Sequence, residues 1–62
     1  MQVKLDKNIL TVDNYKQICN VNNDLIVLEE MKIIGDTLKI KYLDKNRIVI
    51  VGVIKKLLFG DD

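Results

Sequence analysis

The chain has 62 residues and a formal net charge of +1, from ten Lys/Arg against nine Asp/Glu. This length allows one domain at most, and the even charge balance provides no basic face for nucleic acid or an anionic membrane. One cysteine and no histidine exclude an internal disulfide and argue against a structural zinc site, which needs about four Cys or His ligands. We therefore predict a single domain over residues 1–62, with its core in 9–59 and with no metal or other cofactor.

The sequence also argues against a membrane span and a leader. The longest apolar run, Ile48 to Ile54, is far shorter than the about 20 residues that cross a bilayer. Met1–Asp6 alternates polar and apolar residues and lacks the apolar stretch of a signal peptide. We expect a cytoplasmic protein without direct membrane insertion.

The N-terminal quarter of the chain is typical of two short strands. Gln2–Leu5 and Ile9–Val12 alternate apolar and polar residues, and Lys7-Asn8 is a plausible turn between them. Asp13-Asn14 ends the second strand, because Asp and Asn side chains bond to nearby backbone and favour turns. The pattern predicts a hairpin.

The next segment, Tyr15–Val21, fits two structures about equally well. Ile18 and Val21 lie three apart and Asp13 could cap a helical turn, which favours a short helix. An alternating strand through Cys19 fits as well, and a strand is our preferred interpretation. The polar run 22–24 predicts a turn after it.

Two further strands are expected in the middle of the chain. Leu25–Leu28 presents alternate apolar residues inward, and Glu29-Glu30 interrupts the pattern at an exposed edge or bend. Met31–Ile34 resumes the alternation. Gly35-Asp36 is interpreted as a tight connection, because glycine tolerates the positive φ of short hairpins. Gly35 is therefore predicted to be a corner of the structure.

Thr37–Tyr42 alternates cleanly, which predicts a strand with three apolar side chains inside and two lysines outside. The next turn is expected at 44–46. The inward residues are Leu38, Ile40 and Tyr42, and the outward residues are Lys39 and Lys41.

The last third, Arg47–Phe59, is an apolar run rich in β-branched residues, which fit a pleated surface better than a helix. Gly52 in its middle predicts a corner at which the strand leaves one layer and joins another. Leu57 and Phe59 are expected to return to the core, and 60–62 to form a frayed tail. Ile48, Ile50 and Ile54 point to one face, whereas Val49, Val51 and Val53 point to the other.

Turn signals recur about every ten to thirteen residues, as in a meander of short strands. We predict an all-β fold, a meander of about five to seven short antiparallel strands that forms a bent sheet, a two-layer sandwich or a roll. No segment reads as a repeat.

No residue pattern indicates a catalytic centre, so we expect that the protein is not an enzyme. Glu29 and Glu30 are adjacent and would point to opposite faces of a strand, which keeps them from converging on one substrate atom. Cys19 has no histidine as a partner base and is expected to be a small buried or half-buried residue. The GDD at 60–62 echoes viral polymerases without the large domain that this motif needs. The aspartates also lack the spacing of a calcium loop.

Basic and aromatic residues are too few for a convincing nucleic-acid site. Single-strand binders interleave aromatics with Arg and Lys on one face, and the chain has only three aromatics. Four lysines are the best basic patch if they share one surface, although lysines on exposed strands more often discourage unwanted edge pairing. These lysines are Lys39, Lys41, Lys55 and Lys56.

The two-sided apolar C-terminal strand indicates self-association. In a domain of about 60 residues, burial of the core barely offsets the conformational entropy lost on folding, and we expect neither a disulfide nor a metal to add stability. Val49, Val51 and Val53 need cover that so short a chain hardly supplies, and an exposed apolar patch usually marks an interaction site. We predict a homo-oligomer whose interface includes these three valines.

The segment from Ile33 to Phe59 resembles the YabP/YqfC family of small bacterial sporulation proteins. The family pattern is a glycine, then L-x-I-x-x-L, a polar stretch, and I-x-I-x-G-x-I-x-x-L-x-F/Y. The resemblance extends upstream to Ile9. The matching positions are Leu10, Val12, Ile26, Leu28, Gly35, Leu38, Ile40, Leu43, Ile48, Ile50, Gly52, Ile54, Leu57 and Phe59.

The resemblance implies a non-enzymatic structural protein made during spore formation. Members act in some cases alongside a membrane-protein partner, and no catalytic residue is carried over. We therefore expect a scaffolding β-module that self-associates or docks on a partner. The alternative is a small Sm-like or OB-like barrel that binds nucleic acid, and a phage-encoded or toxin-associated accessory protein is a third hypothesis.

Overall fold

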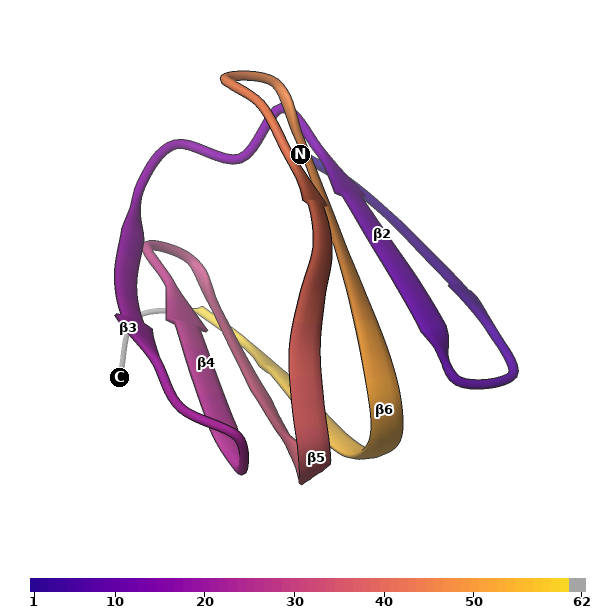
Figure 1. The fold of residues 1–62 in the computed structure, drawn as a ribbon. Coiled ribbons are helices and arrows are strands. Elements are labelled where there is room, and N and C mark those ends of the chain that lie inside the picture. Colours follow the sequence, from indigo (N-terminus) through magenta and orange to yellow (C-terminus); the bar gives the residue numbers. More distant parts are fainter. Residues whose placement is uncertain (61–62) are drawn as a thin grey trace.

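Six antiparallel strands form one sheet in the computed structural model, which describes residues 1–60 (Figure 1). Their order across the sheet is β1-β2-β6-β5-β4-β3, and the predicted all-β fold is confirmed. Within the described residues, no helix is long and apolar enough to cross a membrane. The strands are β1 (Gln2–Asp6), β2 (Ile9–Asp13), β3 (Ile18–Val21), β4 (Leu25–Leu28), β5 (Met31–Leu43) and β6 (Arg47–Phe59).

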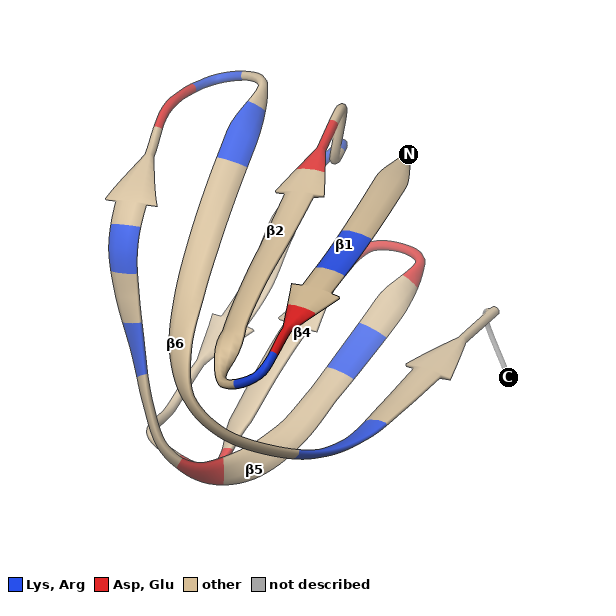
Figure 2. Cartoon of the chain, turned by 90° about the vertical axis from the view of Figure 1, so that its right-hand side faces the viewer, with Lys and Arg blue, Asp and Glu red and all other residues tan. Residues whose placement is uncertain are grey.

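The long hairpin of β5 and β6 bends in its middle and folds the sheet over on itself (Figures 1 and 2). The first half of β6 carries β2 and then β1 along its side. The first half of β5 carries β4 and then β3. The result is a two-layer roll in which each layer contains half of each long strand.

The core lies between the two layers. The inward side chains of β2 and β6 meet those of β4 and β5, and Leu38 fills the bend with 4% of its surface exposed. No polar side chain within the described part of the chain is buried. The buried residues are Leu10, Val12, Ile26, Leu28, Met31, Ile33, Leu38, Ile48 and Ile50.

Two expected elements differ from the structure. The tight connection predicted at Gly35-Asp36 is wrong, because both residues pair with β6 inside the continuous strand β5. The strand continues through both residues, so no turn forms there. In the ambiguous segment, only Ile18–Val21 is a strand, and 15–17 belongs to no strand.

Two aromatic residues predicted in the core are exposed. Tyr42 is 48% exposed, because the register of β5 against β6 shifts after Ile40 and the extra residue turns Tyr42 to the outer face. Phe59 lies in phase with Leu57 but is 60% exposed, because it ends β6 where the opposite layer no longer covers it. Of the predicted tail, Gly60 donates its N–H to the Glu30 carbonyl, while 61–62 lie outside the described residues.

The pairing scheme has an approximate two-fold symmetry about the β5–β6 hairpin. Hairpin β1–β2 lies against β6 as hairpin β3–β4 lies against β5. In each hairpin, a backbone carbonyl of the turn accepts a hydrogen bond from a glycine N–H at the bend of the long strands. Gly52 N–H donates to the Asn8 carbonyl and Gly35 N–H to the Asp24 carbonyl, both at 3.1 Å. Equivalent cross-strand pairs in the two layers are Leu10–Ile50 with Ile26–Ile33, Val12–Ile48 with Leu28–Met31, and Ile9–Val51 with Leu25–Ile34.

This symmetry was not predicted from the sequence. Residues 1–13 correspond to 17–29, and the two segments share no identical residue at this offset. What they share is the apolar alternation of the second strand of each hairpin. The repeat is therefore one of pattern and pairing, which a search for similar residues does not detect.

Candidate interaction surface

The outward side of β2 and the first half of β6 is an apolar patch. Pairing brings Ile9 beside Val51 and Thr11 beside Val49, and across β6 it places Tyr42 beside Val49. Ile9 is 41% exposed, whereas both valines are half-buried by these neighbours. We call this surface the valine face, defined by Ile9, Thr11, Tyr42, Val49 and Val51.

Charged residues surround the valine face rather than entering it. On β1, Lys4 and Asp6 pair with Thr11 and Ile9. At the end of β2, the Asp13 carboxylate accepts from the guanidinium of Arg47, with Nε 2.6 Å from Oδ1. Figure 2 shows the uncharged stretches of β2 and β6 between these charges.

The three valines predicted as an interface do not form one patch. Val49 and Val51 lie together in the valine face. Val53 lies past Gly52, pairs with Asp36 and is 54% exposed at the bend. Gly52 has φ 138°, and Gly35 lies opposite Ile54, so both glycines are located where the long strands bend.

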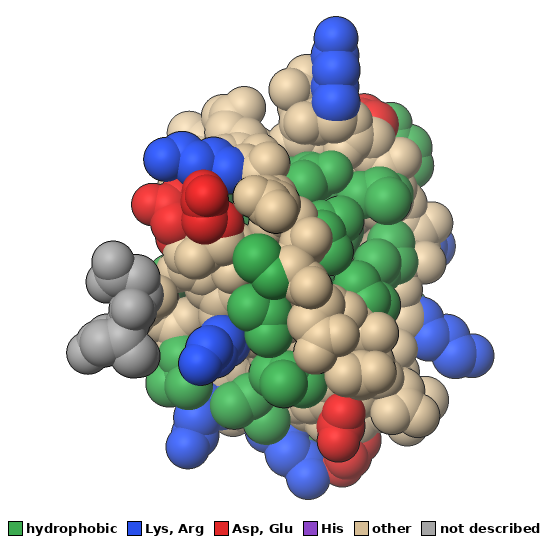
Figure 3. All heavy atoms as spheres, turned by 90° about the vertical axis from the view of Figure 1, so that its left-hand side faces the viewer, with side chains coloured by type: hydrophobic (Ala, Val, Ile, Leu, Met, Phe, Trp, Pro, Cys, Tyr) green, Lys and Arg blue, Asp and Glu red, His purple; other side chains and the backbone are tan. Residues whose placement is uncertain are grey.

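The other layer has an equivalent outer face with a different centre. We call it the lysine face, defined by Leu25, Val27, Lys32, Ile34 and Leu58. Lys32 occupies the position equivalent to Val49, and it is exposed between Val27 and Leu58. In the view toward the side on which β3 lies, hydrophobic side chains form a band with charged groups around it (Figure 3).

The lysines proposed as a shared basic surface are divided between the layers. Lys39 pairs with Val51 in the layer of β2, whereas Lys56 pairs with Ile34 in the layer of β4. Lys55 is an extra residue in β6 and lies 2.8 Å from the Asp36 carboxylate. Lys39 and Lys41 of β5 therefore do not share one patch with Lys55 and Lys56 of β6 (Figure 2).

A polar cluster closes the end of the roll near the β5–β6 turn. The Asp44 carboxylate accepts the Tyr42 hydroxyl at 2.7 Å and the N–H groups of Asn46 and Arg47 at 2.8 Å each. The Tyr42 hydroxyl, and then the two N–H donors, lower the pKa of Asp44. The same hydroxyl bond, and then the negative charge of Asp44, raise the pKa of Tyr42. Tyr15 ties the segment before β3 to this cluster by donating to the Asp44 carbonyl at 2.5 Å.

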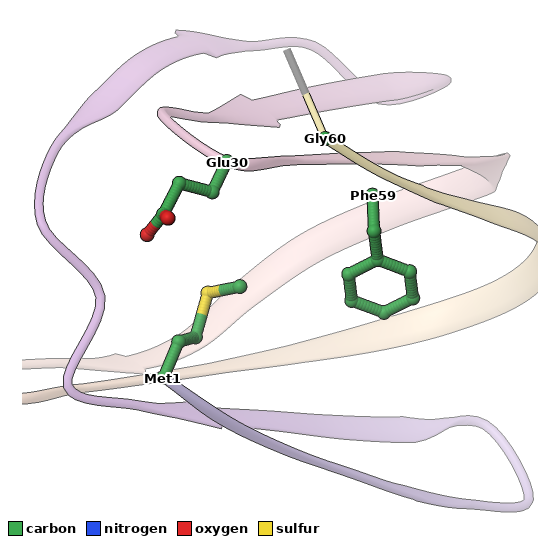
Figure 4. A pocket seen from close by; sticks show the side chains of 4 residues that line it. All are labelled: Met1, Glu30, Phe59 and Gly60. Carbon is green, nitrogen blue, oxygen red and sulfur yellow. The ribbon is translucent and has the colours of Figure 1, made fainter.

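An open pocket of ≈ 370 Å³ lies between the layers at the end of β6. It is lined by Met1, Glu30, Phe59 and Gly60, and the side chains of Met1 and Phe59 project from opposite layers (Figure 4). Among the described residues that line it, Glu30 is the only one with a titratable side chain. Among residues 1–60, no three His, Cys, Asp or Glu side chains gather closely enough to hold a metal ion.

The remaining predicted sites are dispersed. Glu29 and Glu30 form the turn between β4 and β5. The expectation that Cys19 is buried or half-buried is wrong, because Cys19 is exposed at a register shift in β3. Sequence reasoning missed the contribution of Ile9, Thr11 and Tyr42 to the valine face. The apolar Ile9 beside Leu10 was the one available signal, because it makes both sides of β2 partly apolar.

Comparisons with known proteins add no relative. The chain matches no protein-family model, and no curated protein or solved structure shows significant similarity to it.

Proposed function

We propose that the protein is a non-enzymatic structural module that self-associates through the valine face. An apolar centre with a charged rim is the usual composition of a protein–protein interface. Val49 and Val51 form this centre, and Lys4, Asp6 and Lys39 lie at its rim. Most stable homodimers have two-fold symmetry, in which the same patch serves both subunits. A face with an uncharged centre meets this condition, because it brings no charge against its own copy.

The observation that carries the proposal is the difference between the two outer faces. Lys32 on the lysine face stands where the valine face has Val49. Two lysine faces brought together would bury two ammonium groups without a carboxylate partner, and their desolvation costs on the order of several kcal/mol. The valine face therefore supports self-association, and the lysine face opposes it.

Val51→Lys tests the proposal, and Ile34→Lys is its matched control. Both residues are half-buried, both lie one residue before a bend glycine, and they are equivalent in the two layers. We expect the parent to scatter light as a dimer at micromolar concentration, twice the 7.2 kDa of one chain. Val51→Lys should be monomeric, while Ile34→Lys should stay dimeric.

The outcome is decided with circular dichroism as a check on folding. A monomeric parent, or the same loss of mass in both variants, contradicts the proposal. If Val51→Lys unfolds, Ile9→Lys replaces it, because Ile9 is already 41% exposed and tolerates a charge in the monomer. An Ile9→Lys variant that folds and still dimerises would also contradict it.

The biological setting is a separate proposal that rests on the sequence pattern. We propose that the module acts in spore formation, as its resemblance to the YabP/YqfC pattern implies, and that it docks there on a partner such as a membrane protein. Deletion of the gene in a spore-forming host should lower the yield of heat-resistant spores. Normal spore yield in the deletion strain would argue against this setting and would leave the self-association untouched.

Nucleic-acid binding is the competing function, and the small two-layer β-fold is compatible with it. It would require a basic face, whose phosphate contacts weaken steeply with salt. A mobility-shift assay at low salt separates the two functions. Salt-sensitive binding of single-stranded DNA or RNA by the monomeric Val51→Lys variant would favour the competing function.

A further inference from the structure

The second half of β6 has a neighbouring strand on one side only. Its residues 56–59 pair with 31–34 of β5, whereas β2 pairs with β6 only from Arg47 to Val51. Apart from β2 and β5, no strand in residues 1–60 has a Cα atom within 8 Å of a Cα atom of β6, so no strand covers this side. A row of backbone N–H and C=O groups is thus open to another strand.

The hairpin geometry identifies the open groups. Leu28 and Met31 flank a two-residue turn and form a hydrogen-bonded pair, so Met31 directs its backbone groups toward β4. Met31 pairs with Phe59 across β5 and β6 without using those groups. Strand alternation therefore turns the backbone N–H and C=O of Leu57 and Phe59 toward the open edge. Gly60, one residue after Phe59, directs its N–H the other way, toward β5. This N–H donates to the Glu30 carbonyl at 3.1 Å, as the alternation requires.

The symmetry of the fold supplies an internal comparison for this edge. The equivalent edge is the second half of β5, where the register shifts after Ile40 and leaves Lys41 as an extra residue. The segment before β3 is also tied there, through the bond from Tyr15 to the Asp44 carbonyl. Bulges and lysines are the usual means of protecting an edge. The β6 edge also has an extra lysine, Lys55, but this residue comes before the edge, and the register is regular from 56 to 59.

We propose that the open edge of β6 at residues 56–59 binds an extended, acidic β-strand of a partner protein. Strand addition uses main-chain hydrogen bonds for affinity and alternate side chains for specificity. On the outer face, the exposed Lys56 selects a carboxylate opposite it. On the inner face, the 60% exposed Phe59 borders the pocket with Met1, and this pocket accommodates an apolar side chain (Figure 4). The preferred strand alternates acidic and apolar residues.

The same charges disfavour a second copy of the chain at this edge. In an antiparallel pair of two β6 edges, the outward side chains that the described residues bring to the contact are Lys56 and Leu58. Neither provides a carboxylate for Lys56 of the other copy. A foreign acidic strand offers that complement, and its binding is independent of the valine face, which lies in the other layer.

Binding is measured by fluorescence anisotropy with a fluorescein-labelled octapeptide that alternates glutamate and valine. We expect saturable binding, and about tenfold weaker binding of the same peptide with lysine in place of glutamate. Methylation of alternate peptide nitrogens, in the phase that faces β6, should abolish binding because it removes the main-chain donors. Amide resonances of Leu57 and Phe59 should shift most in the NMR spectrum.

Matched variants separate the β6 edge from the rest of the protein. Lys56→Glu should weaken binding about tenfold, and Lys39→Glu, at the equivalent position of β5, should leave it unchanged. Equal binding of the N-methylated peptide, no binding up to millimolar peptide, or shifts centred on β1 or β3 would overturn the proposal. Concentration-dependent shifts of Leu57 and Phe59 without peptide would also overturn it, because they would assign the edge to a second copy. If the parent protein proves to be monomeric, the proposed self-association fails, but the peptide-binding results are unaffected.

Discussion

The carbonyl oxygen of Val53 lies against the α-carbon of Gly35, in the space that a Cβ atom at residue 35 would need. The contact joins β5 to β6 at the bend, where the sheet passes from one layer to the other. Gly52 is confined on the opposite strand, since a Cβ there would stand 2.6 Å from the Thr37 carbonyl and its φ is 138°. The two glycines let the two strands approach closely enough to bend together.

Gly35→Ala should destabilise the protein strongly. The new methyl group meets backbone atoms of Val53, which do not move aside as the end of a flexible side chain does. We expect a loss of about 3 kcal/mol in the free energy of unfolding. Urea unfolding followed by circular dichroism measures it, and a midpoint equal to that of the parent would contradict the close approach.

Leu10→Ala and Ile26→Ala should cost similar free energies of unfolding. Both side chains are fully buried, and the two residues are equivalent in the two layers. Truncation of a buried Leu or Ile to Ala typically costs about 2–5 kcal/mol. Leu58→Ala is the control, because Leu58 is 44% exposed and should cost far less. Unfolding midpoints that differ widely between the first two variants would argue against the symmetry of the core.

Lys32→Val should change the size of the assembly. The substitution gives the lysine face the same kind of centre as the valine face, so each subunit acquires a second adhesive surface. Two such faces on opposite layers support open-ended stacking in place of a closed pair. Light scattering should show masses above the dimer that grow with concentration. A Lys32→Val protein of unchanged mass would show that the lysine does not guard this face.

Asp44 should make the protein sensitive to acid. Its pKa is lowered in the folded state below the ordinary 3.8, first by the Tyr42 hydroxyl and then by two backbone donors. A lowered folded pKa means that the stabilisation is present above pH 3.8 and is lost as the pH falls through the folded pKa. Urea midpoints measured from about pH 5 down to about pH 2 should fall less in Asp44→Asn than in the parent. Parallel pH profiles would contradict this role of Asp44.

Tyr42 should show the opposite dependence at high pH. Its folded pKa is raised above the ordinary 10.0, first by the hydrogen bond to Asp44. The stabilisation is therefore complete below pH 10.0 and is lost as the pH rises through the folded pKa. Tyr42→Phe removes the hydroxyl, so the urea midpoint of this variant should change less with pH across this range. A Tyr42→Phe profile as steep as that of the parent would assign the alkaline loss to other groups.

Alternation in the sequence was enough to predict most strands and most of the core. Leu10, Ile26, Ile33 and Ile48 are buried as their phase requires, because a side chain on a strand lies on the face opposite to that of its neighbours. The bent terminal strand was also foreseen, since a glycine inside a β-branched run has few other uses. These features depend on local physics.

What the sequence did not reveal depends on register. The phase of Tyr42 with Ile40 was misleading, because one extra residue opposite β6 reverses the face. The continuity of β5 through Gly35 depends on β6, a partner far along the chain. The valine face likewise takes Ile9 from β2 and Tyr42 from β5, which meet only through their pairing with β6. No local pattern encodes such pairings.

The strand order also has a consequence for synthesis on the ribosome. Ile9 of β2 pairs with Val51 of β6, so 42 residues (51 − 9) separate them in the chain. At about 5–20 residues per second, translation of that stretch takes about 2–8 s. Throughout this interval Leu10 and Val12 have no opposite strand to cover them. The apolar side of the nascent N-terminal hairpin therefore stays uncovered until β6 has been made.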